Sequence, residues 1–153
     1  MTGPHAEWLA GGVLAQCREL VHLDLSRNQI GSAGAECVAG VLGQCPALAH
    51  LDLSHNYITE AGAKSLAAVL AQCTALAHLD LGENIIGRDG AASLAGVLAQ
   101  CASLPCLDVF NNDIGAEGAE SLARVLAQCP VLTHLDVGVG AVRIAGSLQS
   151  HGQ

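Results

Sequence analysis

The stretch LAHLDLSHNYI, residues 48–58, returns along this chain at a constant interval. Residues 76–86 read LAHLDLGENII, looser copies begin at residues 20, 104 and 132, and successive copies start 28 residues apart. The last copy, LTHLDVGVGAV, departs from the pattern after Val137. The same interval separates Cys17, Cys45, Cys73, Cys101 and Cys129. A period of this length is typical of a solenoid, in which each unit buries its apolar face against its neighbours.

Each unit opens with the pattern of a half-buried strand. In the copy quoted above, polar and apolar residues alternate from His50 to Ser54. This period of two places successive side chains on opposite faces of a strand. The side chains expected to point into the core are those of Leu48, Leu51, Leu53, Asn56 and Ile58.

A helix is predicted to follow each strand. Thr59 is a suitable N-cap, and Glu60 suits the positive end of the helix dipole. We expect this helix to close at Gln72 and Cys73. The buried helical face, read from spacings of three and four residues, consists of Ala63, Leu66, Ala67 and Leu70.

The constant alternation of strand and helix determines the architecture. Strands joined by helical crossovers run parallel, and right-handed crossovers put every helix on one side of the sheet. Helices need ~9–10 Å each and strands ~4.8 Å, so the stack must curve. The sequence therefore predicts an α/β solenoid, a short right-handed horseshoe with concave parallel strands and convex helices.

The consensus LxxLxLxxNxIGxxGAxxLAxxLxxC resembles leucine-rich repeats of the ribonuclease-inhibitor-like subclass. That subclass includes ribonuclease inhibitor, the Ran GTPase-activating protein and the ligand-sensing ends of NOD-like receptors. The resemblance covers residues 13–142. It implies the fold and a tendency to bind proteins, whereas the partners of its members differ widely.

The two ends depart from the repeat inside what we treat as a single domain, 1–153, of about five units. Residues 1–19 form a partial unit, in which Trp8 is placed to cover the first edge. Residues 138–153 form a degenerate unit: Gly140 replaces asparagine, and residues 143–148 resemble a helix start out of register. Terminal units of solenoids normally carry a polar outer face. We therefore expect exposed apolar edges and a homo-oligomer formed through them.

Composition limits the kinds of partner. The formal net charge is −8, with only six Lys and Arg, which argues against binding nucleic acid or an anionic membrane. An acidic surface suits a basic protein partner, although it also keeps a protein soluble. No apolar run approaches the ~18–20 residues of a membrane span, and no signal peptide is visible. Seven cysteines without a secretory signal indicate reduced thiols and a cytoplasmic location.

Two repeating columns are interpreted as structural. The asparagines should lie inside and satisfy backbone groups of the turns; they are Asn28, Asn56, Asn84 and Asn112. The repeating cysteines, ~9–10 Å apart on adjacent helices, exceed the ~7 Å Cα limit of a disulfide and do not converge on zinc. We expect them to be small buried hydrophobes. Of the two cysteines outside the column, Cys37 is placed on a helix, and Cys106, on the concave face, is the better candidate for an accessible thiol.

The concave face carries the residues most able to recognise a partner. One column is histidine, interrupted by Cys106, and the next is aspartate throughout. Carboxylates stacked ~4.8 Å apart should repel one another and titrate as a coupled set, with some pKa values raised. The pKa values of the adjacent histidines should rise as well. The residues predicted to contact a partner are His22, Asp24, His50, Asp52, His78, Asp80, Asp108, Phe110, His134 and Asp136.

Three interpretations of these columns stay open. The first is an acidic, histidine-lined surface for a protein partner, with pH-dependent affinity. The second is incidental capture of a divalent metal by His and Asp of neighbouring strands, although we assign no metal ligand and no cofactor. In the third, the columns only solvate the face, and the repeats are structural spacers of a larger receptor or GTPase regulator.

The second and third positions after each aspartate vary between copies. The second positions are Ser26, Ser54, Gly82, Phe110 and Gly138, and the third positions are Arg27, His55, Glu83 and Asn111. Phe110 is the only phenylalanine. An exposed aromatic there would be a binding anchor; the alternative is that it tucks under the last repeat.

No catalytic motif is visible. The chain contains no GxSxG, Walker loop, CxxC or HExxH sequence, and the Ser residues near the His and Asp columns offer no triad order or oxyanion hole. The sequence therefore predicts a protein-interaction module rather than an enzyme.

Overall fold

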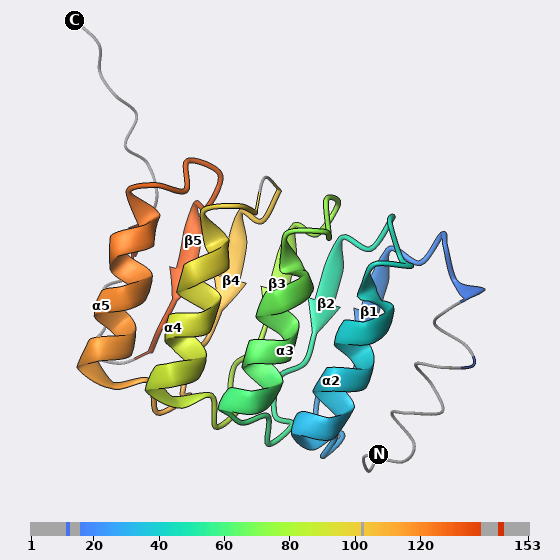
Figure 1. Cartoon of the computed structure of the whole chain (residues 1–153), viewed down its shortest axis with the longest axis horizontal. Coiled ribbons are helices and arrows are strands. Elements are labelled where there is room, and N and C mark those ends of the chain that lie inside the picture. Colours follow the sequence, from blue (N-terminus) through green and yellow to red (C-terminus); the bar gives the residue numbers. More distant parts are fainter. Residues whose placement is uncertain (1–11, 13–15, 102, 139–143, 146–153) are drawn as a thin grey trace, which may run out of the picture.

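The computed structural model describes residues 12, 16–101, 103–138 and 144–145. Strands and helices alternate along this part of the chain (Figure 1), and the helices lie side by side in one layer in front of the sheet. The elements are β1 (His22–Asp24), α2 (Gly31–Leu42), β2 (His50–Asp52), α3 (Glu60–Leu70), β3 (His78–Asp80), α4 (Gly87–Leu98), β4 (Cys106–Asp108), α5 (Gly115–Leu126), β5 (His134–Asp136) and β6 (Ile144–Ala145).

The sheet follows the order of the chain, from β1 to β6. Strands β1 to β5 pair in parallel, each residue with its equivalent in the next copy, as His22 with His50 and Leu51 with Leu79. The predicted α/β solenoid is confirmed. We refer to the face of the sheet that points away from the helices as the concave face.

The core lies between the sheet and the helix layer. All five side chains predicted to point inward from the unit beginning at Leu48 are buried, as are the four predicted on the inner face of α3. Leu51 and Leu79, at the centre of their strands, are fully enclosed. Because each unit is covered by the next, the core continues through the stack, and among the described residues its buried members include no aromatic side chain.

The strands are shorter than the alternation predicted. The expected strand reached Ser54, whereas β2 ends at Asp52. The reason is local: the N–H of Ser54 donates to Oδ1 of Asp52 at 2.9 Å and so does not donate to the neighbouring strand. The N–H of Leu53 still reaches Asp80 O at 2.8 Å, so the units stay connected beyond the strand.

The helix starts partly agree with prediction. Thr59 precedes α3, but its side chain makes no capping bond; its hydroxyl instead pairs with that of Ser32 at 2.7 Å. In the other units glycine holds this position, and Gly31 has a φ of 60°, which glycine adopts without steric cost. The helix α3 ends at Leu70, before the predicted end at Gln72 and Cys73. These two residues instead form the turn after the helix, in which Cys73 N–H donates to Leu70 O at 3.1 Å.

The structure tests only some of the predictions made for the two ends of the chain. Trp8 and Gly140 lie outside the described residues. Ile144 and Ala145 form a strand that pairs antiparallel with β5, Leu135 opposite Ile144. The predicted helix start is therefore wrong at these two positions. The edge of β5 is also covered there rather than open, because β6 supplies its missing neighbour.

None of the helices in the described part of the chain is long and apolar enough to span a bilayer.

Candidate functional site

The strand register builds the two predicted columns on the concave face. In each three-residue strand the central leucine points into the core, so the residues on either side of it point outward. Of the two flanking columns, one reads His22, His50, His78, Cys106 and His134, and the other Asp24, Asp52, Asp80, Asp108 and Asp136.

Three of the histidines stack on one another. The ring centroids of His22 and His50 are 5.2 Å apart, and those of His50 and His78 are also 5.2 Å apart, with interplanar angles of 21° and 23°. Cys106 stands between His78 and His134 in the column. The stack thus presents a continuous row of imidazole edges over the first three strands.

The aspartates have a structural role that the sequence reasoning missed. Oδ1 of every aspartate in the column accepts a hydrogen bond from the N–H two residues later; at Asp80 the donor is Gly82, at 2.8 Å, and at Asp108 it is Phe110, also at 2.8 Å. This Asx turn ends the strand. The sequence did contain a signal for these turns, because an aspartate ends each strand from β1 to β5 and Asx turns favour that residue type.

Burial differs along the aspartate column and sets its acidity. Burial raises the pKa of Asp80, and the charges of Asp108 and Asp52 raise it further. Burial also raises the pKa of Asp108, with Asp136 adding to it. The predicted upward shift is therefore confirmed for these two, but burial rather than mutual repulsion is its main cause. Asp24 behaves oppositely, because hydrogen bonds from Ser26 lower its pKa.

The raised pKa values of Asp80 and Asp108 predict that the stability these two residues contribute falls as pH rises. A folded state with raised carboxyl pKa values holds protons that the unfolded chain has already released. The stabilisation is full below the ordinary aspartate pKa of ~4 and is lost as pH rises through the raised values. We expect Asp80→Asn with Asp108→Asn to flatten this dependence, measured as urea unfolding free energy at several pH values. The amide keeps the Oδ1 acceptor, and an unchanged pH slope would contradict the prediction.

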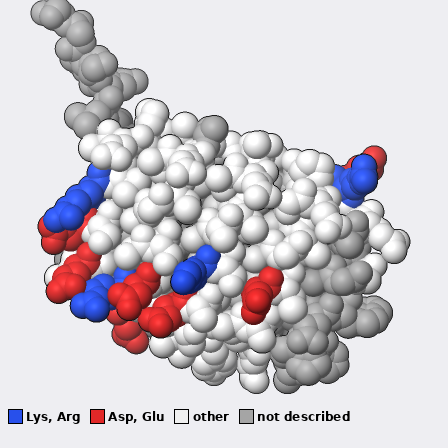
Figure 2. Space-filling model, viewed as in Figure 1, with Lys and Arg blue, Asp and Glu red and all other residues white. Residues whose placement is uncertain are grey.

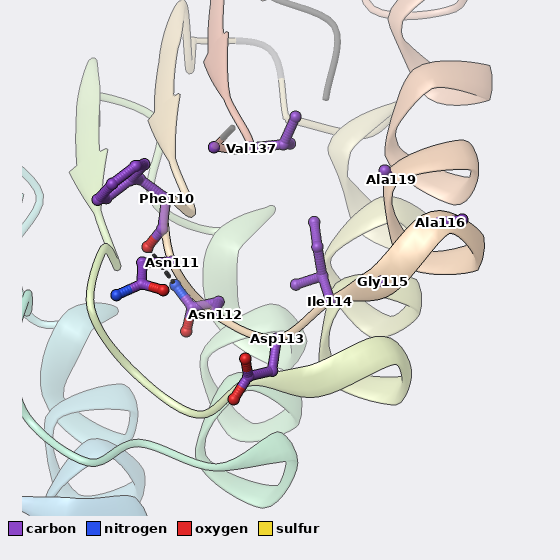
Figure 3. A pocket seen from close by; sticks show the side chains of 10 residues that line it. Phe110, Asn111, Asn112, Asp113, Ile114, Gly115, Ala116, Ala119 and Val137 are labelled. Atoms are coloured by element: carbon purple, nitrogen blue, oxygen red, sulfur yellow. Dashed lines mark hydrogen bonds between the residues drawn. The ribbon is translucent and has the colours of Figure 1, made fainter. Parts of the chain in front are cut away.

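Phe110 lies at the last repeat. It is half-buried, and its ring approaches Gly138: a Cβ built on that glycine would lie 3.4 Å from Phe110 Cδ2. This contact corresponds to the tucked alternative, although part of the ring stays accessible. Phe110 also lines a cavity of about 450 Å³, together with Ile114 and Val137 (Figure 3).

In the first four units, the third residue after the aspartate adopts a left-handed backbone conformation. Arg27, His55, Glu83 and Asn111 have φ between 51° and 59°. Of these residue types only asparagine commonly visits this region, so the residue types gave little signal. The conformation turns the chain from strand to helix and leaves Arg27 and Asn111 exposed.

The asparagines of the column bond the turns; Asn56, Asn84 and Asn112 lie inside, as expected, whereas Asn28 is half-buried. Asn56 donates through Nδ2 to the carbonyls of Leu25, Leu53 and Ser54, at 2.8 to 3.0 Å. Its Oδ1 accepts from the N–H groups of Asn28 and Ile30. Each buried asparagine thereby links the turn of its own unit to that of the unit before.

The cysteines only partly match the prediction. All seven are thiols; Cys45 and Cys129 are buried, whereas the other three of the column are half-buried. Cys73 Sγ donates to Val69 O at 3.4 Å, and burial raises the pKa of this thiol to about 11. Cys106 is half-buried, and burial together with Asp108 and Asp80 raises its pKa. Because the thiolate is the reactive form, Cys106 is a weak nucleophile at neutral pH.

The described residues offer no site for the metal considered above. Within the described residues no group of three or more His, Cys, Asp or Glu side chains is arranged to hold a metal ion. Parallel columns keep their members apart, and metal ligands must converge.

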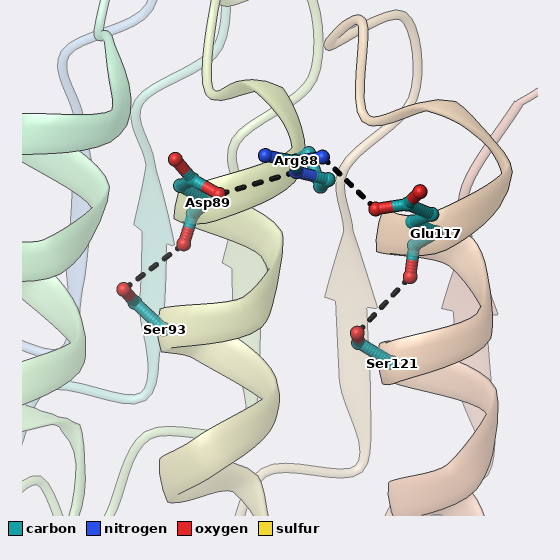
Figure 4. Close-up of polar contacts among 5 residues, drawn as sticks. All are labelled: Arg88, Asp89, Ser93, Glu117 and Ser121. Atoms are coloured by element: carbon teal, nitrogen blue, oxygen red, sulfur yellow. Dashed lines mark hydrogen bonds and ion pairs between the residues drawn. The ribbon is translucent and has the colours of Figure 1, made fainter.

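The helix side carries the ion pairs. Figure 2 shows the charged side chains gathered toward the α4 and α5 end of this face, with most of the remainder uncharged. Arg88 bridges two helices, since its Nε lies 3.3 Å from Asp89 Oδ1 and its Nη1 lies 3.0 Å from Glu117 Oε2 (Figure 4). Exposed pairs of this kind contribute little stability. The two ion pairs do neutralise Arg88, the only basic residue of α4.

Comparisons with known proteins agree with this geometry. A family model described as Leucine Rich repeat matches residues 16–39, 44–67, 72–95 and 100–123. The structure is similar to one titled Leiomodin-1 Actin-Binding Site 2, at 17% identity and a TM-score of 0.76, over 88% of this chain and 78% of that one. It is also similar to the tropomodulin C-terminal domain of Caenorhabditis elegans, at 11% identity and a TM-score of 0.77, over 90% and 84% of the two chains.

At these identities the two structural likenesses show the fold alone. No curated protein sequence matches the chain. The four family matches, by contrast, cover more than half of the chain and repeat with the interval of its strands and helices. The chain belongs to the leucine-rich repeat family.

Proposed function

We propose that this chain is a non-catalytic module that binds another protein on its concave face. The observation that carries the proposal is the alignment of the histidine and aspartate columns, side by side and in register over five strands. The contact residues are those predicted from sequence: His22, Asp24, His50, Asp52, His78, Asp80, Asp108, Phe110, His134 and Asp136.

Protein binding by a related scaffold supports this proposal. The leiomodin-1 structure is titled an actin-binding site, so a similar fold serves protein recognition in that case. Recognition by a rigid repeat surface costs little conformational entropy on binding, because the side chains are already ordered. The stacked imidazoles are an example of such order.

A basic partner suits this face best. Oδ1 of each aspartate is engaged by its Asx turn, while the second carboxylate oxygen has the capacity to accept further hydrogen bonds. Fourteen acidic residues against six Lys and Arg would also accelerate association with a cation.

Two further assignments accompany the proposal. The 28-residue interval and the full helix of 11 or 12 residues in each described unit support the ribonuclease-inhibitor-like subclass. Reduced thiols throughout support a cytoplasmic location.

Charge reversal of the concave face tests the proposal. We expect Asp52→Lys with Asp80→Lys to weaken binding of an oligolysine peptide about tenfold or more, because like charges then face each other. Isothermal titration calorimetry at low and at physiological salt would measure the change. The Asp→Asn variants of the same residues should have a smaller effect, since they remove charge and keep the Asx turns.

Glu36→Lys with Glu60→Lys provides the matched control. Both glutamates are exposed on helices, so this variant changes net charge equally away from the concave face. Equal loss in both double variants would mean that only total charge matters. Unchanged affinity in Asp52→Lys with Asp80→Lys would instead favour the spacer interpretation.

A further inference from the structure

Two large apolar side chains are exposed next to each other on the edge where the strands lead into the helices, the lower edge in Figure 1. Tyr57 is 62% exposed and Ile85 is 48% exposed. Each directly follows an asparagine of the repeating column, and 28 residues separate them. Their loops are joined, because Ile85 N–H donates to Ile58 O at 2.8 Å. Tyr57 and Ile85 therefore occupy equivalent, neighbouring places in the second and third units.

The fold does not explain why these two residues are apolar. The equivalent positions of the first and fourth units hold Gln29 and Asp113, which are also exposed. A polar side chain is therefore compatible with this place in the repeat. Single exposed hydrophobic residues are common, but two neighbours on one edge form a patch, and exposed apolar patches mark sites of protein interaction.

The backbone under this patch is held in place. The residues on either side of Tyr57 and of Ile85 are buried, and they are Asn56, Ile58, Asn84 and Ile86. Asn56 N–H also donates to Asn84 Oδ1 at 2.9 Å, which ties the two loops together. Because the loops are already ordered, a contact here would cost little main-chain entropy.

The charges around the patch differ in sign between its two ends. At the first unit, Arg27 is exposed two residues before Gln29. At the other end, Asp113 is exposed in the fourth unit, and Glu83 lies two residues before Ile85. An edge with opposite charges at its two ends is complementary to itself when a second copy approaches in the reverse direction.

We propose that this edge binds a second copy of the chain about a two-fold axis that passes between the second and third units. Tyr57 then packs against Ile85 of the second copy, and Ile85 against its Tyr57. Arg27 comes to lie over the fourth unit of the second copy, within reach of its Asp113. The apolar contacts are thus central and the charged contacts lie at the rim, as is usual for protein interfaces.

A second copy suits this edge better than an unrelated partner with one sign of charge, which would match only one end. The contact is nevertheless small. Stable complexes bury ~1,200–2,000 Å², which is more than two exposed apolar side chains and a few charged neighbours supply from each copy. We therefore expect an equilibrium between one and two chains that depends on protein concentration.

Sedimentation equilibrium over a range of protein concentrations tests the apolar centre. The mass of the unaltered protein should rise from one chain toward two. Tyr57→Gln with Ile85→Thr should weaken the dimer about tenfold or more, because central aromatic residues carry much of the energy of an interface. Gln29 shows that the first of these replacements is compatible with the repeat.

Val21→Gln is the matched control. Val21 is 53% exposed but precedes β1, at the opposite end of the strands, so this variant should dimerise as the unaltered protein does. A mass of one chain at every concentration would overturn the proposal. Equal weakening in the control, or no weakening in Tyr57→Gln with Ile85→Thr, would overturn it as well.

Two charge variants test the two-fold arrangement. Arg27→Glu and Asp113→Lys should each weaken the dimer, since each places like charges opposite one another. Glutamate is compatible with the backbone at position 27, because Glu83 has a φ of 56° at the equivalent position and Arg27 has one of 59°. An equimolar mixture of the two variants should dimerise again, because both end contacts of the mixed pair join opposite charges. A mixture that dimerises no better than either variant alone would show that the copies do not meet in this direction, and the proposal would be wrong.

This inference goes beyond the proposed function and concerns a different surface from the concave face. Asp52→Lys with Asp80→Lys should dimerise as the unaltered protein does, and Tyr57→Gln with Ile85→Thr should keep its affinity for oligolysine. The two proposals can therefore fail independently.

Discussion

Asn84→Ala is expected to lower the free energy of unfolding by about 3–5 kcal/mol. Asn84 is buried, and its Nδ2 donates to the carbonyls of Leu53, Leu81 and Gly82. Its Oδ1 accepts from Asn56 and Ile58, at 2.9 and 3.0 Å. Alanine removes all five bonds and leaves buried backbone groups of two adjacent units without partners, which is the costly case.

Urea unfolding followed by circular dichroism would measure this loss. Asn111→Gly is the control, because Asn111 is exposed, its side chain bonds only Glu83, at 2.7 Å, and glycine adopts its φ of 51° without strain; we expect a change within about 0.5 kcal/mol. Similar losses in the two variants would contradict the structural role assigned to the buried column.

Gly62→Ala is expected to lower the free energy of unfolding by about 1–3 kcal/mol. A Cβ at this position would lie 2.6 Å from Ile58 Cγ2 and 3.1 Å from both Ala35 Cβ and Ser32 Cα. Two of these atoms belong to the preceding unit, so α2 and α3 would have to separate. Close packing of this kind tolerates no added methyl group without displacement.

Gly96→Ala gives the opposite sign and serves as the control. A Cβ there meets nothing within 4 Å, and Gly96 lies inside α4. Alanine should therefore raise stability by up to about 1 kcal/mol, because it restricts the unfolded chain and favours the helix. Parallel melting of the two variants measures both effects, and a stabilised Gly62→Ala would refute the packing argument.

Much of the fold was predictable because one local pattern recurs. A leucine such as Leu51 lies between histidine and aspartate in four of the five copies, with Cys106 replacing histidine in the other, so its inward direction follows from the period of a strand. The helical face with Leu66 follows in the same way, and the constant interval then aligns His50 with His78. Each of these statements requires only neighbours along the chain and the repetition of a unit.

The candidate site was predictable in position but less so in chemistry. The sequence placed Asp80 on the concave face, yet its raised pKa has burial as the leading cause, and burial depends on the surrounding units. The Asx turns at the strand ends were overlooked, although the aspartates that form them were identified. Phe110 was left open between an exposed anchor and a tucked ring, and the structure places it between the two, because it lies near Gly138 but is only half-buried.

The sequence by itself determined the period, the register, the core and the residues on each face, because these depend on side-chain spacing within one repeated unit. Only the tertiary structure decided what happens where the repeat pattern breaks down after Val137. The antiparallel β6 and the cavity that Phe110 lines both lie at the last described unit. Neither follows from spacing within one unit, because a repeat pattern specifies contacts between units only while the repeat continues.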